Sequence, residues 1–314
     1  MGDKMACKKP TKKREVVDEI DISELFNDIE DENQIEFSIE RDDIEAPKIP
    51  TEKTGFIWKV SKIQSLIDDI TCGGIFSTTA LLVNDDNTME VCTGSDMVSR
   101  RVLVHPVNDD NLKFKTIGSG IMVINWENLS DKLSFIFDST DIVQVVFIPE
   151  IKRIMLFKPK PRASLQIEAT EYSSMNIIEE PDYTESDGII TVNDIELSSL
   201  IKTNATDIKE IIKYYSRFAE AKIPLHIVDG EKISVKLSGM IDGGMVEMNK
   251  PIYPTKVVSE EKDVLSYFAD GFKEVISECS GGIEMRFANN SSLYVKQNTS
   301  DVEIISIIRN VEQE

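Results

Sequence analysis

From Gly55 onward, hydrophobic residues recur in some segments at every second position, as in strands, and in others at intervals of three or four, as in helices. These segments predict two successive runs of strands and helices. In the first run, GFIWKV predicts a strand and SKIQSLIDDI predicts a helix, because the isoleucines and leucine of that segment share one helical face. A hairpin in TTALLVNDDNTMEVCT and a strand in SRRVLVHPV follow. The run continues with strand GIMVIN, helix WENLSDKLSFIF and three closing strands, IVQVVFI, RIMLFKP and SLQIEA.

The second run predicts the same succession of elements. It begins with strand SSLIKT and a helix over Asp207–Ala221, for which Asp207 is the expected cap and Glu210 the residue three positions on. A hairpin in PLHIVDGEKISVKLSG and strands in GGMVEMN and PTKVVS come next. KDVLSYFADGFKEVIS predicts a second helix, and GIEMRF, SLYVKQ and VEIISIIRN predict closing strands. The hairpins LLVNDDNTMEV and LHIVDGEKISV align, so we expect an internal duplication of units of roughly 110–120 residues.

Hairpin-connected strands form antiparallel sheets, and two helices in each unit can cover one sheet face. The expected fold class is therefore α+β, with a first domain over residues 55–170 and a second over 196–314. Residues 171–195 form a long acidic connecting loop, and residues 1–54 an acidic tail whose high charge and few aromatic residues predict disorder. Within the tail, KKPTKKR also suits a nuclear import signal, and Ile20–Ile29 a short amphipathic binding helix.

Composition narrows the class of protein. The 314 residues carry 35 Lys and Arg against 56 Asp and Glu, a net charge of −21, so most of the surface is expected to repel nucleic acid. No apolar run approaches the ~20 residues that span a bilayer, and MGDKMACKKPTKKR has no apolar stretch typical of a secretory signal. The four cysteines lie far apart without a C-x-x-C pair, which favours reduced thiols and no structural zinc.

Enzyme motifs are not found in the sequence. It has no G-x-x-x-x-G-K-[ST], G-x-S-x-G or H-E-x-x-H pattern, so we expect a protein that is not an enzyme and that needs no metal or other cofactor. Carboxylates are so frequent that pairs arise by chance on solvated faces. An enzyme with an unrecognised acidic metal site stays open as an alternative, and metal-dependent turnover would support it.

Three segments resemble the sliding clamps of the proliferating cell nuclear antigen (PCNA) family. IPLHIVDGEKISVKLSGMIDGGMVEMN is similar to the family's second-domain hairpin and Gly-rich bend, and GIMVINWENLSDKLSFIFDSTDIVQVVF to the end of its first domain. SLYVKQ with VEIISIIRNVEQE is similar to its C-terminal strands and acidic tail. The family usually ends its last strand in Ala-Pro, where this chain has Ile308-Arg309, and its connecting loop is shorter.

This resemblance implies a duplicated clamp fold with antiparallel sheets outside and two helices per domain lining a central hole. It implies a DNA polymerase processivity factor that encircles double-stranded DNA without sequence preference, as a ring for which a homotrimer is expected. The implied partners are a DNA polymerase, other replication proteins and an ATP-dependent clamp loader, with no membrane. The implied location is intracellular, either the nucleus or a cytosolic replication site. A clamp-fold interaction hub that does not encircle DNA is the alternative.

The predicted DNA-facing residues are basic side chains on or beside the four helices. Lys209, Lys213 and Arg217 follow one another at intervals of four, which forms a row on one side of a helix. In an isolated helix such a row indicates only a solvated face, and the resemblance adds the phosphate-facing role. The full set is Lys62, Lys132, Lys209, Lys213, Arg217, Lys222 and Lys273.

Apolar residues in segments expected to be exposed predict a pocket for a partner peptide. In the family, the corresponding segments converge on a site that accepts a short hydrophobic-aromatic motif. The expected residues are Met97, Val98, Ile190, Val192 and Ile308. The alternatives are that these residues pack into the core or pin the connecting loop down, or that Ile177 and Ile178 supply the register of the connecting loop. Trp58 and Trp126 are assigned to the core.

The resemblance also places the ring contacts at strand edges. Ser164–Thr170 of one subunit is expected to pair with Gly244–Lys250 of the next, as unpaired edges readily do.

Overall fold

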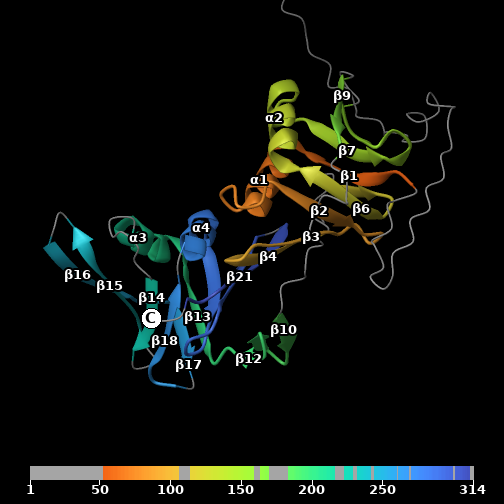
Figure 1. The fold of residues 1–314 in the computed structure, drawn as a ribbon. Helices are drawn as coiled ribbons and strands as arrows, with labels where there is room; N and C mark the ends of the chain where they lie inside the picture. The colour runs from red at the N-terminus through yellow and green to blue at the C-terminus, as the bar shows by residue number, and fades with distance from the viewer. Residues whose placement is uncertain are drawn as a thin grey trace, which may run out of the picture. The chain divides into compact units, whose positions relative to one another are not determined.

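The computed structural model describes residues 52–105, 114–158, 163–169, 183–215, 223–228, 232–241, 244–259, 261–268, 270–299 and 301–311. Chain contacts divide the protein into Met1–Glu45 and Ala46–Glu314, and every described residue belongs to the second unit. The predicted disorder of residues 1–54 therefore concerns residues that lie almost wholly outside the described part of the chain. Figure 1 shows the described elements.

Eleven elements follow one another in an order that occurs twice along the chain. The first set is β1(Thr54–Lys59), α1(Val60–Thr71), β2(Thr78–Val83), β3(Met89–Gly94), β4(Val98–Val104), β5(Lys115–Ile117), β6(Gly120–Asn125), α2(Trp126–Ile136), β7(Ile142–Ile148), β8(Arg153–Lys158) and β9(Ala163–Glu168). The second set is β13(Ser199–Asn204), α3(Ala205–Tyr215), β14(Ile223–Val228), β15(Lys232–Ile241), β16(Gly244–Ile252), β17(Lys256–Ser259), β18(Val264–Phe268), α4(Asp270–Glu278), β19(Gly282–Arg286), β20(Leu293–Asn298) and β21(Val302–Ile308). A short 3-10 helix, Pro149–Ile151, lies between β7 and β8.

Strand pairing repeats as closely as the element order. β1 pairs with β5 and β7 just as β13 pairs with β17 and β19, and β2 pairs with β3 and β6 just as β14 pairs with β15 and β18. All the pairings are antiparallel. The expected α+β duplication of antiparallel sheets is confirmed, and its physical origin is that both halves carry the same succession of apolar periods.

One strand pair joins the two halves. β21 pairs with β4 over seven residues, from Val302 opposite Val104 to Ile308 opposite Val98. This joint produces a nine-stranded sheet, β17-β13-β19-β20-β21-β4-β3-β2-β6, beside a five-stranded sheet β5-β1-β7-β8-β9 and a four-stranded sheet β16-β15-β14-β18. The two halves therefore share one continuous sheet.

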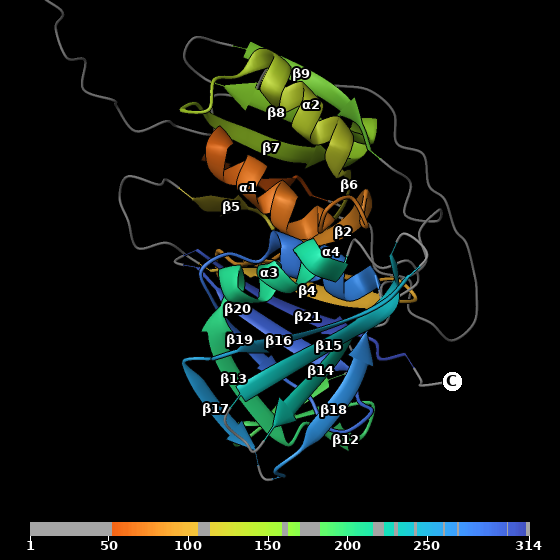
Figure 2. The same cartoon turned by 90° about the vertical axis from the view of Figure 1, so that its left-hand side faces the viewer.

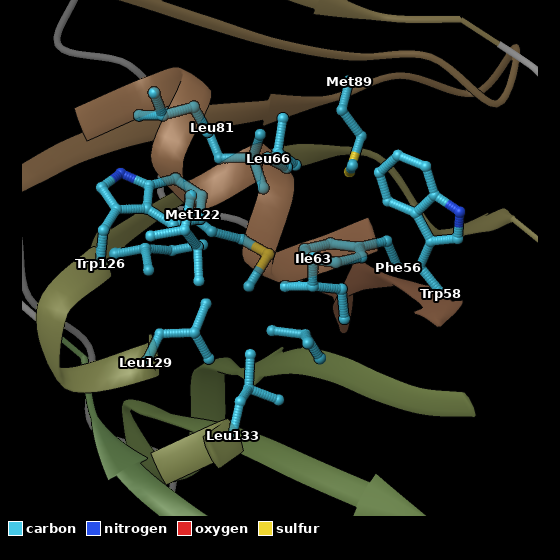
Figure 3. Packing of buried hydrophobic residues seen from close by; sticks show 14 of the residues in the cluster. Phe56, Trp58, Ile63, Leu66, Leu81, Met89, Met122, Trp126, Leu129 and Leu133 are labelled. Atoms are coloured by element: carbon cyan, nitrogen blue, oxygen red, sulfur yellow. The ribbon is translucent and has the colours of Figure 1, made fainter. Parts of the chain in front are cut away.

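The helices owe their form to local sequence and to burial of one face. In α2, the Asn125 side chain accepts a hydrogen bond from the Asn128 N–H at 2.9 Å and caps the first turn. Ile63 and Leu66 of α1 pack with Leu129 and Leu133 of α2 in the first core (Figure 3). Trp58 and Trp126 are 1% and 0% exposed in this core, so their assignment to the core is confirmed.

A second core lies under α3 and α4. It includes Ile208 of α3 and Phe272, Val275 and Ile276 of α4, all 0% exposed. Val98 of β4 belongs to the same cluster, so the joint between the halves is sealed by apolar packing as well as by strand pairing.

The structure corrects two predicted elements of the second half. The predicted helix over 262–277 is wrong in its first part, where Val264–Phe268 forms β18 and alternates between buried and half-buried residues. This segment forms a strand rather than a helix because pairing with β14 buries Val264 and Phe268 on the core side. The first helix of this half begins at Ala205, and Asn204 rather than Asp207 accepts the Thr206 N–H bond, at 2.9 Å.

A three-stranded sheet forms within residues 183–196, at the end of the segment expected to connect the domains. Its strands are β10(Tyr183–Ser186), β11(Ile189–Val192) and β12(Ile195–Glu196), paired antiparallel in the order β10-β11-β12. The alternative register at Ile177 and Ile178 lies outside the described residues.

Candidate DNA-facing helices and partner-binding surface

The four helices lie on the same side of the sheets and form a layer there (Figure 2). α1 contacts α2, and α3 contacts α4, in the same arrangement in each half. This layer carries five of the residues that were predicted to face DNA: Lys62, Lys132, Lys209, Lys213 and Lys273.

Lys62 and Lys273 each lie beside a carboxylate. Lys62 Nζ donates a hydrogen bond to Asp301 Oδ2, a carboxylate that is almost fully buried. Lys273 Nζ lies 3.8 Å from Glu274 Oε1 in a more exposed pair. Lys132 and Lys213 are exposed and Lys209 is half-buried, while Arg217 and Lys222 lie outside the described residues.

The helix layer carries more acid than base. α1, α2 and α4 contain one lysine each and α3 contains two, whereas α1, α2 and α3 contain two carboxylates each and α4 contains three. Five cations therefore stand against nine carboxylates within the described helices. Counted over all of their sides, the four helices within the described residues therefore have a net negative charge.

The five residues of the predicted peptide pocket fall into separate groups. Met97 is 45% exposed, and its carbonyl accepts a hydrogen bond from the Arg309 N–H at 2.9 Å. Val98 and Ile308 are paired across β4 and β21 and face the second core. Ile190 and Val192 are buried in a third cluster, on the other side of β21. In the single chain, four of the five residues are therefore buried in two different cores.

The third cluster fastens the three-stranded sheet to the nine-stranded one. Ile190 and Val192 pack with Leu197, Tyr294, Ile305 and Ile307. Two arginines add polar contacts: Arg101 Nη1 donates to the Tyr183 hydroxyl at 3.2 Å, and Arg286 Nη1 to the Gly188 carbonyl at 2.6 Å. Ile189 and Ile195 remain 47% and 44% exposed on this sheet.

The sequence reasoning missed the partners in this third cluster. VEIISIIRN contained a usable signal, since its period of two places Ile305 and Ile307 on one face and Ile304 and Ile308 on the other. The structure assigns Ile304 and Ile308 to the two helix-side cores and Ile305 and Ile307 to the third cluster. A strand buried on both faces therefore indicated a second layer over it.

Two end strands, β9 and β16, complete the candidate site. β9 ends the five-stranded sheet and β16 ends the four-stranded sheet, and within the described residues no strand pairs with the outer edge of either. In the duplicated order, β9 corresponds to β21 and β16 corresponds to β4. β9 and β16 are thus the counterparts of the two strands that join the halves, but they do not pair with each other within the chain.

Three of the solved structures to which this chain is similar are PCNA structures. One is of the C-terminal region of FEN-1 bound to A. fulgidus PCNA, and the others are of PCNA from Thermococcus kodakaraensis and from Entamoeba histolytica. Each superposes with a TM-score of 0.61 at 11% sequence identity and covers 83% of this chain, and 100%, 100% and 99% of the respective PCNA chain. The chain has the PCNA-like sliding-clamp fold. Neither a scan against protein-family models nor a comparison with curated proteins gives a match.

No three His, Cys, Asp or Glu side chains converge on a point where a metal ion would fit, in the ranges that the structure describes. None of the described helices is both long and apolar enough to cross a membrane.

Proposed function

We propose that this protein is a sliding clamp: a ring that encircles duplex DNA and tethers a DNA polymerase and other replication proteins to it. The proposed activity is mechanical rather than catalytic. Three copies supply six equivalent half-units, the helix layer faces the DNA, and an ATP-dependent loader opens the ring. The division into domains at 55–170 and 196–314, with a connector over 171–195, is part of the same proposal.

The observation that carries the ring is the joint between β21 and β4. Within the chain, β21 pairs with β4. The equivalent strands, β9 and β16, each form an open sheet edge among the described residues. Pairing of β9 with β16 of another copy repeats the internal joint and leaves two further edges exposed, one at each end of the pair. A head-to-tail contact of this type closes into a ring when its rotation fits.

The register of the proposed contact follows from the duplication. Ala163 is the first residue of β9 that pairs with β8, and Glu303 is the first residue of β21 that pairs with β20, so these two positions correspond. Ile252 lies opposite Ile233 and Val104 lies opposite Met89, so Ile252 and Val104 also correspond. Carrying over the β21–β4 register sets Ser164 opposite Lys250 of the neighbouring copy. This agrees with the expected contact between Ser164–Thr170 and Gly244–Lys250.

Cross-linking tests this register. Opposite residues of antiparallel strands have Cα atoms ~4.5–5.5 Å apart, within the ~4.4–6.8 Å that a disulfide spans. The double variant Ser164→Cys, Lys250→Cys should therefore oxidise to a closed species of three 35.4 kDa chains. Ser164→Cys with Glu247→Cys, three residues out of register, is the matched control, and the unmodified chain with its own cysteines gives the background. Only monomers after oxidation at micromolar concentration would contradict the pairing.

Weak contact with DNA follows from the charge of the helix layer. The described helices hold five lysines among nine carboxylates, so we expect retention on DNA to come from topology rather than from tight phosphate contacts. Lys132 on α2 and Lys209 on α3 are candidate cations to guide the duplex, while Lys62 is held by Asp301.

Partner tethering is proposed for the surface around β10–β12. One of the PCNA structures holds the C-terminal region of another protein, FEN-1, which supports this kind of contact. The exposed side chain of Ile189 is the candidate contact on this sheet, and the neighbouring Ile190 and Val192 are buried beneath it in the third cluster. Met97, the other exposed candidate, lies beside Gly271 of α4. Ile189→Ser should weaken binding of a polymerase-derived peptide in a calorimetric titration, and unchanged affinity would place the site elsewhere.

The net negative charge of the helix layer favours one second function, a clamp-fold interaction hub that does not encircle DNA. The two functions differ in whether closing the ring traps a DNA circle.

A further inference from the structure

A cavity of about 390 Å³ opens where the C-terminal part of α1 approaches α4 and the turn between β20 and β21. Gly73, just after α1, lies close to α4: a Cβ added at Gly73 would lie 3.2 Å from the Glu274 carboxylate. The volume falls within the ~300–1,000 Å³ of ligand pockets and far exceeds the ~30 Å³ of one water in the liquid.

Carboxylates dominate the polar lining of this cavity. Lys62, Asp68 and Asp69 come from α1, Glu278 from α4 and Asp301 from the β20–β21 turn. With all groups ionised, one positive charge stands against four negative ones, so the cavity has a net formal charge of −3. A ligand that suits it carries positive charge.

One buried atom requires a hydrogen-bond donor. Asp301 is 3% exposed, and Lys62 binds only its Oδ2, while Oδ1 has no hydrogen-bond partner among the described residues. An unpaired buried carboxylate oxygen costs stability, typically ~1–3 kcal/mol. The Trp58 indole N–H, also buried in the cavity wall, likewise has no partner among the described residues. Figure 3 shows the Trp58 nitrogen on the side of the ring turned away from the labelled core residues.

The spacing of the charges favours an elongated organic cation over a metal ion. Asp69 lies seven residues after Lys62 on α1, so the two share a helix face about 10 Å apart along the axis. The Asp301 end and the Asp69 end of the cavity are therefore distinct, and no three carboxylates of the described residues converge as a metal requires. Between the ends, Trp58 and Leu66 provide an apolar wall.

We propose that this cavity binds an aliphatic polyamine, with one ammonium group on Asp301 Oδ1, a second near Asp69 and Glu278, and methylenes against Trp58. The site lies within one chain and does not depend on ring formation or on DNA.

The two tryptophans make the test specific. Trp58 lines the cavity, whereas Trp126 donates its indole N–H to Thr79 Oγ1 at 2.6 Å and is absent from the lining. Adding spermidine to ¹⁵N-labelled full-length protein should shift the Trp58 indole signal saturably at one equivalent and leave Trp126 in place. An unmoved Trp58 signal, or an equal response to MgCl₂ at matched ionic strength, would overturn the proposal.

Variants separate the two ends of the site. Asp69→Asn and Asp301→Asn should each weaken spermidine binding at least tenfold, while Asp131→Asn, an exposed carboxylate on α2, should not change it. If Asp301→Asn fails to fold after losing its ion pair with Lys62, Asp69→Asn alone decides. Butylamine, with a single ammonium like that of a lysine side chain, should bind at least tenfold more weakly than spermidine. Equal affinities would contradict a site with two anionic ends.

Discussion

Asp69 is the carboxylate on which burial acts most clearly. Burial raises the pKa of its carboxyl from 3.8 to about 6, Arg100 acts in the opposite direction, and Asp68 and Glu278 add to the rise. Arg100 is itself 2% exposed, and its Nη1 donates to Cys72 Sγ and Ser306 Oγ at 3.1 and 3.2 Å. Even beside a buried guanidinium, the neutral form of Asp69 is thus favoured relative to the unfolded chain.

This pKa predicts a pH-dependent gain in stability for Asp69→Asn. Because the folded pKa lies above the unfolded one, the wild-type protein loses stability as the pH rises from about 4 to 6, and does not regain it above 6. The variant lacks this loss and should exceed wild type by about 1–3 kcal/mol at pH 7.5, with the difference vanishing near pH 3.5. Urea unfolding at both pH values measures it, with Asp131→Asn, an exposed carboxylate on α2, as the matched control. A variant less stable than wild type at pH 7.5 would show that Asp69 serves mainly as a partner of Arg100.

At the scale of residues, the sequence predicted core positions better than contacts. Trp58 and Trp126 were assigned correctly because large aromatic residues in apolar periods are usually buried. The Lys62–Asp301 pair joins residues far apart in the chain, and no local pattern indicates it. The peptide pocket was predicted from apolar residues in supposedly exposed segments, but pairing of β21 with β4 buries Val98 and Ile308.

At the scale of elements, local periodicity identified the elements but not all of their boundaries. VLSYF carries an apolar pattern compatible with a helix, and only its pairing with β14 makes it a strand. β10–β12 was missed because a short sheet of this kind gains its stability from the surface on which it packs.

The dependence of β10–β12 on the third cluster gives a test of that packing. Ile190→Ser with Val192→Ser should detach this small sheet, because burying each side chain is worth roughly 1.5–3 kcal/mol. Hydrogen exchange should then show loss of protection at residues 189–196, while β20 and β21 keep theirs. Ile189→Ser, at a 47% exposed position, is the matched control and should leave protection unchanged. Wild-type protection in the double variant would mean that Arg101 and Arg286 suffice to hold the sheet.

At the scale of the whole molecule, the duplication was the most informative feature of the sequence. Two aligned hairpins and a repeated order of strands and helices predicted the repeated fold. The structure extends the repeat to the strand pairings within each half, and β21–β4 and the β10–β12 sheet are the exceptions. The sequence could not reveal that β21–β4 joins the halves, because strand order across a sheet depends on tertiary packing. That joint is what turns β9 and β16 into a matched pair of edges.

The central claim is that copies of this chain close around DNA. Ser164→Cys, Lys250→Cys protein oxidised in the presence of a DNA circle should be trapped on it, and should stay bound in 1 M salt, where phosphate contacts are lost. We expect the protein to leave when the circle is linearised or the disulfide is reduced. Protein that washes off the intact circle in high salt, although fully cross-linked, would contradict encirclement and favour the interaction hub.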